Sequence, residues 1–249
     1  MSDSLVIIPT YNEKENIDLM IKTVFSLPVD FDILIIDDNS PDGTAAIVKG
    51  IQQSLKEKPS SKQLHLLSRK GKLGLGTAYI EGFKFGMEKG YAYIIEMDAD
   101  FSHDPNDLVK LKDACAIEGN DMAIGSRYVT GVNVVNWPLT RVLISYFASY
   151  YVRKITGMKY RDTTAGFVCY RRKVLETINL NKVKFVGYAF QIEMKFLTYK
   201  HGFKIKEVPI IFTDRVRGQS KMSTGIIKEA LFGVLQMKIG SWFKKYPQA

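Results

Sequence analysis

Residues 94–105 read IIEMDADFSHDP, an aliphatic run that ends in closely spaced carboxylates. Residues 91–97 carry apolar side chains on both faces, which is typical of a strand in a parallel sheet covered by helices. Asp98 and Asp100 follow at once, and side chains two residues apart point to the same side of an extended chain. Because like charges this close repel, the stretch predicts either a solvated acidic turn or a site for a divalent cation.

Strand-like and helix-like patterns alternate around this stretch, which predicts an α/β fold with a mostly parallel open sheet and helices on both faces. Asn12 is placed to cap the first helix. We expect a main domain of residues 1–224 and a C-terminal amphipathic helix, 225–249, packed on the domain or at a membrane interface. The expected strands are 5–9, 31–36, 64–67, 91–97, 122–125, 165–170 and 204–208 (running on towards 212), and the expected helices are 13–27, 44–56, 77–89, 137–155, 190–200 and 225–246.

Length and composition favour an ordinary globular protein. The 249 residues are 46% hydrophobic and 24% charged, which suits one large domain with its own core. Cys115 and Cys169 lie far apart in the sequence and are interpreted as buried thiols, and the scattered histidines predict no histidine-based metal site. The N-terminus lacks the basic segment of a signal peptide, and no apolar run reaches the roughly 18–20 residues of a transmembrane helix.

The formal charge of +9 favours anionic partners, namely phosphorylated small molecules, anionic lipid or nucleic acid. The same charge also suits a protein that only needs to stay soluble. Since no recognisable nucleic-acid-binding module accompanies it, we expect no nucleic-acid partner.

The first two expected strands also end in polar residues. The first runs into Tyr11 and Glu13 without the glycine-rich turn of dinucleotide-binding folds, and an aromatic ring with a carboxylate can stack on and hydrogen-bond a base. The second ends at Asp38, and ligands of open α/β sheets bind beyond the carboxyl ends of the strands. Taken singly, Glu13 equally suits a helix start and Asp38 a turn cap.

A glycine-rich run, GKLGLG at residues 71–76, leads into the third expected helix. Its glycine order matches neither GxGxxG nor GxxxxGK[ST], so it is a weak indication of phosphate binding. Because Arg69, Lys70 and Lys72 lie next to it, this helix entry could still lie beside phosphates.

Six segments carry a resemblance that covers nearly the whole chain: PTYNE (9–13), DDNSPDGT (37–44), GLGTAY (74–79), MDADFSHDP (97–105), GSRY (125–128) and DRVRGQSKMS (214–223). In this order they resemble the polyprenol-phosphate mannosyltransferases of the dolichol-phosphate mannose synthase type, within inverting glycosyltransferase family 2 of the GT-A fold. The DxD alone is a weak motif, and the run of six is specific. The resemblance implies transfer of mannose from GDP-mannose to a polyprenyl phosphate, with Mg²⁺ or Mn²⁺ as cofactor.

The resemblance also assigns donor-side roles. Asp98, Ala99 and Asp100 match the DxD that binds metal and sugar phosphate, and Arg215 and Lys221 match a pair on a mobile loop that closes over the donor. Ser102 stands where some archaeal relatives have a glutamine that is a further metal ligand. The positions that match those binding the guanine nucleotide are Pro9, Tyr11, Glu13, Ile36 and Asp38.

On the acceptor side, Arg127 matches an arginine at the phosphates, and Arg141 and Ser145 match positions that grip the acceptor phosphate. Asp98, Asp100 and Arg127 are therefore the expected catalytic residues. The attacking phosphate oxygen is already ionised at neutral pH, so no strong general base is needed, and His103 is expected to support the site rather than to act as that base. Attack opposite the departing GDP would give a β-mannosyl phosphate lipid.

Two aromatic and basic stretches, residues 137–154 and 230–245, are typical of helices in an anionic membrane interface, although both could equally pack on the sheet. We therefore expect a peripheral cytoplasmic protein on the inner leaflet. The alternatives are a family-2 enzyme that uses UDP-glucose or another donor on undecaprenyl phosphate, one with a sugar acceptor, and a non-catalytic membrane-associated nucleotide sensor. The basic acceptor residues favour a phosphate acceptor, and the complete set of site residues favours an enzyme.

Overall fold

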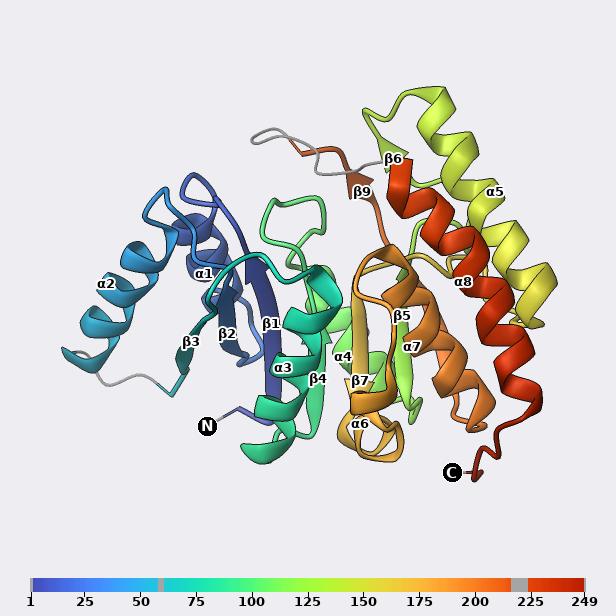
Figure 1. The fold of residues 1–249 in the computed structure, drawn as a ribbon. Coiled ribbons are helices and arrows are strands. Elements are labelled where there is room, and N and C mark those ends of the chain that lie inside the picture. Colours follow the sequence, from blue (N-terminus) through green and yellow to red (C-terminus); the bar gives the residue numbers. More distant parts are fainter. Residues whose placement is uncertain (1, 58–60, 216–223, 249) are drawn as a thin grey trace.

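A mostly parallel sheet with helices on both faces organises the chain, as expected (Figure 1). The structure is a computed structural model that describes residues 2–57, 61–215 and 224–248. Within these ranges seven strands form one sheet in the order β3-β2-β1-β4-β7-β5-β8. Their bounds are β1 Ser4–Thr10, β2 Asp32–Asp37, β3 Leu64–Ser68, β4 Tyr93–Glu96, β5 Met122–Ser126, β7 Val168–Arg171 and β8 Ile205–Pro209.

One strand runs against the others. β7 pairs antiparallel with both β4 and β5, whereas β3, β2, β1 and β4 pair in parallel, as do β5 and β8. The parallel strands therefore end at a common edge, which is where open α/β sheets bind ligands. Above this edge a short parallel pair, β6 (Val134–Val135) and β9 (Phe212–Thr213), joins two distant segments of the chain.

Side-chain alternation along the central strands builds two cores. The side chains of Val6 and Ile8 in β1 pack on one face with helices α1, α2 and α4, and those of Leu5 and Ile7 pack on the other face with α3, α6 and α7. This is the double apolar face that a helix-covered sheet requires. The helices are α1 Ile17–Phe25, α2 Thr44–Glu57, α3 Leu75–Glu88, α4 Asp107–Ala116, α6 Arg172–Thr177 and α7 Tyr188–Lys200, with a 3₁₀ turn at Leu180–Lys182.

Two long helices form an outer layer on α7. α5 (Leu139–Thr156) and α8 (Thr224–Trp242) lie side by side at one end of the molecule (Figure 1). Val152 of α5 and Val234 of α8 are buried with Ile192 and Phe196 of α7 in a small third core. Both helices are thereby fixed beside the carboxyl end of the sheet.

The expected helix that follows the first strand begins later than its pattern indicated. Asn12 does not cap it, because its φ of 58° is left-handed and its amide donates to Ser40 Oγ at 3.0 Å. The amides of Asn16 and Ile17 instead donate to the carbonyl of Glu13, and the helix starts at Ile17. The chain uses residues 11–16 to turn over the edge of the sheet before the helix begins.

Candidate active site

The ends of β1 and β2 are joined by hydrogen bonds, so the two predicted nucleotide-binding segments do lie together. Thr10 Oγ1 donates to Asp37 Oδ1 at 2.9 Å, and the amide of Asp38 donates to the carbonyl of Thr10 at 3.0 Å. The amide of Glu13 donates to Thr44 Oγ1 at the start of α2. Pro9, Tyr11, Glu13, Ile36 and Asp38 therefore lie around one stretch of the carboxyl edge.

Two of the basic residues beside the glycine-rich run, Arg69 and Lys72, face this same region. Arg69 Nε lies 2.8 Å from Asp38 Oδ1, and its backbone amide donates to the carbonyl of Asp37. The Lys72 ammonium lies 5.3 Å from the centroid of the Tyr11 ring. Burial raises the pKa of Asp38, and the charge of Arg69 opposes that shift.

The two central aspartates lie in a bend directly after β4, where Phe101 has a φ of 60°. Asp100 Oδ1 accepts a hydrogen bond from the Ser102 amide at 3.0 Å, and Asp100 Oδ2 lies 3.1 Å from Arg215 Nη2. The Asp98 side chain is 37% exposed because it faces a cavity. The two carboxylates thus lie in one bend and not on an extended strand, and their joint binding of a cation stays a prediction.

The electrostatics of this pair fit a hard cation. Burial, and after it repulsion from Asp100, raises the pKa of Asp98 to about 7, while Arg215 opposes the shift. Water in the cavity screens part of this effect. Among the residues that the structure describes, no group of three or more histidine, cysteine, aspartate or glutamate side chains could hold a metal. Two carboxylates completed by substrate phosphates are a common arrangement for Mg²⁺.

His103 supports the bend. Its ring is buried, stacked on Phe167 at 4.7 Å and in edge contact with Phe212 at 5.3 Å. Its Nδ1 accepts a hydrogen bond from the Asp98 amide at 3.3 Å. Burial lowers the pKa of His103 to about 4, so the imidazole is neutral at physiological pH.

Arg127 is held by a partner that the sequence did not reveal. Its Nε and Nη2 donate to the two carboxylate oxygens of Asp162, each at 2.7 Å, and Nη2 also donates to Thr164 Oγ1 at 2.8 Å. Burial would raise the pKa of Asp162, but the Arg127 charge and hydrogen bonds outweigh it and lower that pKa. The guanidinium lies on the cavity wall near Trp137 and Phe212, and its contact with a phosphate stays a prediction.

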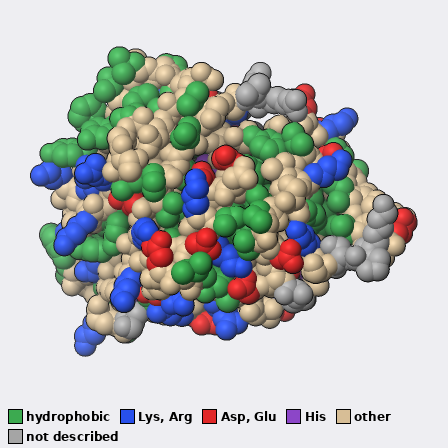
Figure 2. Space-filling model, turned by 180° about the vertical axis from the view of Figure 1, so that it is seen from behind, with side chains coloured by type: hydrophobic (Ala, Val, Ile, Leu, Met, Phe, Trp, Pro, Cys, Tyr) green, Lys and Arg blue, Asp and Glu red, His purple; other side chains and the backbone are tan. Residues whose placement is uncertain are grey.

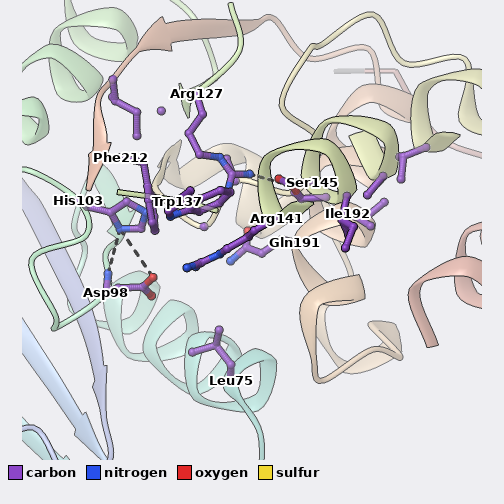
Figure 3. Close-up of a pocket in the computed structure, with 18 of the residues that line it drawn as sticks. Leu75, Asp98, His103, Arg127, Trp137, Arg141, Ser145, Gln191, Ile192 and Phe212 are labelled. Atoms are coloured by element: carbon purple, nitrogen blue, oxygen red, sulfur yellow. Dashed lines mark hydrogen bonds and ion pairs between the residues drawn. The ribbon is translucent and has the colours of Figure 1, made fainter. Parts of the chain in front are cut away.

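Arg141 and Ser145 lie on the first two turns of α5 and line the same cavity (Figure 3). The Arg141 guanidinium lies 4.0 Å from the centroid of the Trp137 ring, and its Nη1 lies 2.8 Å from Asp214 Oδ1. Asp214 immediately precedes Arg215, so the expected acceptor side and donor side meet at this point. Lys221 lies outside the described residues.

The cavity itself has a volume of about 340 Å³ and two chemically different ends. Asp98, Arg127, Arg141 and Arg215 make one end charged. The other end runs between α5, α7 and α8 and is lined by Ile144, Ala148, Tyr151, Val152, Ile192 and Leu231. A molecule with an anionic head and an apolar tail matches this division.

A buried polar chain lies beneath the charged end. Gln191 of α7 lines the cavity, and its Nε2 donates to Glu96 Oε2 at 2.8 Å. Lys195 Nζ donates to Gln191 Oε1 at 3.3 Å and to the carbonyl of Ala165 at 2.6 Å. Burial raises the pKa of Glu96 and lowers that of Lys195. Glu96, an acid inside the aliphatic run of β4, was the visible signal for this network.

The outer helices also expose apolar side chains. On α5 these include Leu139, Leu143 and Phe147, and on and after α8 they include Phe232, Trp242 and Phe243. Hydrophobic side chains gather at the upper left of Figure 2, the side on which α5 lies. Within the described part of the chain, no helix has the length and apolar character needed to cross a membrane.

Comparisons with known proteins give a consistent assignment. Residues 5–178 match the sequence model of "Glycosyl transferase family 2". The chain is 45% identical over 236 residues to a polyprenol monophosphomannose synthase of Mycolicibacterium smegmatis, covering 95% of this chain and 87% of the relative. It is 44% identical over 230 residues to an undecaprenyl-phosphate mannosyltransferase of Micrococcus luteus, covering 92% and 91%.

Solved structures share the fold at low sequence identity. A glucosyl-3-phosphoglycerate synthase of Mycobacterium tuberculosis, in complex with Mn²⁺, UDP-glucose and phosphoglyceric acid, superposes with a TM-score of 0.64 at 17% identity, covering 95% of this chain and 79% of that one. A mannosyltransferase of Pyrobaculum calidifontis, in complex with GDP-mannose and Mn²⁺, gives 0.59 at 16% identity, covering 98% and 66%. Similarity at this level concerns the fold alone.

Proposed function

The chain belongs to glycosyl transferase family 2, and on that basis we propose that it moves mannose from GDP-mannose to a polyprenyl phosphate, with inversion at the anomeric carbon. The observation that carries the proposal is the cavity in which Asp98, Arg127 and Arg141 lie at one end and apolar side chains of α5 and α7 at the other. Its charged end suits two phosphate groups and a sugar, and its apolar end suits a lipid chain. The two mannosyltransferase relatives support the same acceptor class.

On the donor side, Tyr11 and Asp38 at the ends of β1 and β2 bind the guanine nucleotide together with Pro9, Glu13 and Ile36. The diphosphate and mannose then extend along the carboxyl edge towards Asp98 and Asp100. These two carboxylates would hold the Mg²⁺ or Mn²⁺ ion, which when bound neutralises the growing charge of the departing GDP. Arg215, which lies at Asp100 in this structure, would supply further positive charge to the departing GDP diphosphate.

On the acceptor side, the guanidinium groups of Arg127 and Arg141 hold the phosphate of the lipid. The Arg141 guanidinium can bind phosphate in a bidentate manner, which fixes the direction of attack as well as the affinity. Arg127, whose Nε and Nη2 are held by Asp162, adds positive charge beside it. Asp162 keeps Arg127 in place, and the Trp137 ring keeps Arg141 in place. Ser145, one turn after Arg141, offers a hydroxyl to the same group.

The reaction needs no strong base, because the second pKa of a phosphate monoester is about 6 and its oxygen is largely ionised at neutral pH. The neutral, buried His103 is consistent with this, since its Nδ1 already accepts the Asp98 amide. A single displacement by the phosphate oxygen on the face opposite GDP converts the α-linked donor into a β-mannosyl phosphate. The bond from the anomeric carbon to GDP breaks as the bond to the acceptor oxygen forms.

The protein reaches its lipid acceptor as a peripheral protein at an anionic membrane surface. Exposed Leu139 and Phe147 of α5 enter the interface, and the net charge of +9 draws the protein towards anionic lipid. The apolar end of the cavity lies between α5 and α8, so a lipid tail would pass directly from this surface to the charged end. We assign this surface to the cytoplasmic leaflet.

The test is sugar transfer into an organic-extractable lipid. Labelled GDP-mannose and UDP-glucose are offered separately with a polyprenyl phosphate, in Mn²⁺, in Mg²⁺ and in EDTA. We expect metal-dependent label from GDP-mannose, loss of it in Asp98→Asn and Asp100→Asn, and retention in Asp104→Asn, an exposed neighbour outside the site. Label from UDP-glucose alone would show that the donor is UDP-glucose and not GDP-mannose. Absence of lipid label from either donor would contradict the assignment of a lipid acceptor.

A further inference from the structure

Two consecutive residues of opposite charge connect the donor side to the acceptor side. Asp214 Oδ1 lies 2.8 Å from Arg141 Nη1 on α5, and Arg215 Nη2 lies 3.1 Å from Asp100 Oδ2 in the bend after β4. The side chains of all four residues are at most 29% exposed. One dipeptide thus neutralises a residue assigned to the acceptor phosphate and a residue assigned to the cation.

The backbone of this dipeptide is fixed to both sides as well. The amide of Thr213 donates to the carbonyl of Ser102, two residues after Asp100, at 3.2 Å. The amide of Asp214 donates to the carbonyl of Val135 in β6 at 3.0 Å, and the Arg215 amide donates to Asp214 Oδ1 at 3.1 Å. Since the two side chains share this short backbone, one cannot be displaced far without the other.

Each contact imitates a ligand of the proposed reaction. A carboxylate on a guanidinium has the charge and hydrogen-bond geometry of a phosphate on that guanidinium. A guanidinium on a carboxylate places positive charge where a divalent cation would be. An acceptor phosphate that approaches Arg141 while Asp214 remains there meets a like charge, which opposes its binding.

Resting on the proposed function, we propose that Asp214 is a positioning residue that makes acceptor binding depend on prior occupation of the donor side. While Arg215 pairs with Asp100, Asp214 holds Arg141. With a cation held at Asp100 and the GDP diphosphate attracting Arg215, Arg215 would leave Asp100 and Asp214 would withdraw from Arg141, so that the Arg141 guanidinium would turn to the acceptor phosphate. Donor nucleotide therefore binds before acceptor, and the lipid phosphate is held only weakly while the donor side is empty.

A simpler role for Asp214 predicts the opposite change in acceptor affinity when the residue is removed. If Asp214 only oriented Arg141 for the phosphate, its removal would weaken acceptor binding in every state. In the proposed role, its removal strengthens acceptor binding to the donor-free protein and leaves binding to the donor-loaded protein nearly unchanged. Whether removal of Asp214 strengthens or weakens acceptor binding to the donor-free protein therefore distinguishes the two roles.

The experiment measures the Kd of citronellyl phosphate, a short isoprenyl monophosphate, by calorimetry with and without GDP and Mn²⁺. For the unaltered chain we expect binding about tenfold tighter with GDP and Mn²⁺, within the usual range of coupling between two sites. In Asp214→Asn, the donor-free protein should bind citronellyl phosphate nearly as tightly as the protein loaded with GDP and Mn²⁺ does. The ratio of the two Kd values should therefore fall towards one. Asp214→Glu, which keeps the charge, should retain the ratio.

Asp18→Asn is the matched control, because Asp18 forms an ion pair of 2.7 Å with Lys22 on the exposed face of α1. It should keep the unaltered ratio, and thermal unfolding of each variant checks that it is folded. A ratio in Asp214→Asn equal to that of the unaltered chain, or weaker binding in both states, would overturn the inference. Absence of binding to the unaltered chain with GDP and Mn²⁺ would instead contradict the proposed function, and the inference with it.

Discussion

Arg127 and Asp162 face each other as a two-pronged ion pair, with Nε and Nη2 each 2.7 Å from a separate carboxylate oxygen. The Asp162 amide donates to Glu207 Oε1 of β8 at 2.9 Å, so β8 helps to hold Asp162 in position. Asp162 is fully buried and Arg127 is 8% exposed. A guanidinium held in this way keeps one orientation on the cavity wall before any substrate arrives.

Breaking this pair should destabilise the protein. Asp162→Asn leaves the Arg127 charge buried without its anion, and loss of one partner of a buried ion pair costs about 3–5 kcal/mol. Urea unfolding at pH 7 measures the free energy of unfolding. Asp18→Asn, which removes an exposed pair, should change it by less than about 1 kcal/mol. Equal losses in the two variants would contradict a special role for the buried pair.

The acceptor assignment of Arg141 predicts a selective kinetic change. Arg141→Lys keeps the charge but loses the planar fork and the stacking on Trp137. Since a hydrogen bond to a charged group contributes about 1.5–3 kcal/mol, the KM for polyprenyl phosphate should rise about tenfold or more. The KM for GDP-mannose should stay the same. Steady-state kinetics with each substrate varied in turn measures both KM values. A rise in the KM for GDP-mannose alone would contradict the assignment of Arg141 to the acceptor phosphate.

The raised pKa of Asp98 predicts a conflict between stability and activity. In the unfolded chain its pKa is about 3.9, and in the fold it is about 7. Folding therefore favours the protonated form, and the ionised form weakens the fold as pH rises from about 4 to 7. Asp98→Asn should accordingly raise the melting temperature of the metal-free protein more at pH 8 than at pH 5, while abolishing transfer. The cavity water makes this gain small, and scanning calorimetry at both pH values measures it. A gain that is larger at pH 5 would contradict the assigned shift.

The exposed face of α5 predicts membrane binding that can be weakened without harming the fold. Phe147 is 58% exposed, and burying such a side chain in lipid contributes about 1.5–3 kcal/mol. Phe147→Ser should therefore lower sedimentation with vesicles rich in anionic lipid about tenfold at unchanged melting temperature. Ile117→Ser is the control, since Ile117 is 78% exposed and lies at the end of α4, not on α5. An equal loss of vesicle binding in both variants would contradict the assignment of α5 to the membrane interface.

Local patterns were sufficient for much of the architecture. The aliphatic runs that became β1, β2 and β4 predicted a parallel sheet, because strands buried on both faces have few other solutions. Helix α4 was missed although Leu108, Leu111 and Cys115 repeat at helical spacing and are buried. β7 runs antiparallel to β4 and β5, and a four-residue apolar pattern does not indicate in which direction a strand runs relative to its neighbours.

Site residues could be proposed from the sequence where a charged residue directly follows a strand. They could not be proposed where the role depends on an ion pair with a residue far away in the sequence. Asp98, Asp100 and Asp38 belong to the first kind. Asp162 and Asp214 belong to the second, because their partners lie 35 and 73 residues away in the sequence. The glycine-rich run shows a third case: a Cβ at Gly76 would lie 2.8 Å from the Phe190 ring, so this glycine permits close packing of α3 on α7.

The most direct test of single displacement onto a phosphate is the structure of the reaction product. Phosphorus and carbon NMR of the lipid formed from GDP-mannose and a polyprenyl phosphate reports both the linkage and the anomeric configuration. The site described by Asp98, Arg127 and Arg141 predicts a phosphodiester that joins lipid and sugar, with mannose in the β configuration. An α-linked mannose would contradict the single displacement, and a sugar attached elsewhere than to phosphorus would contradict the phosphate acceptor.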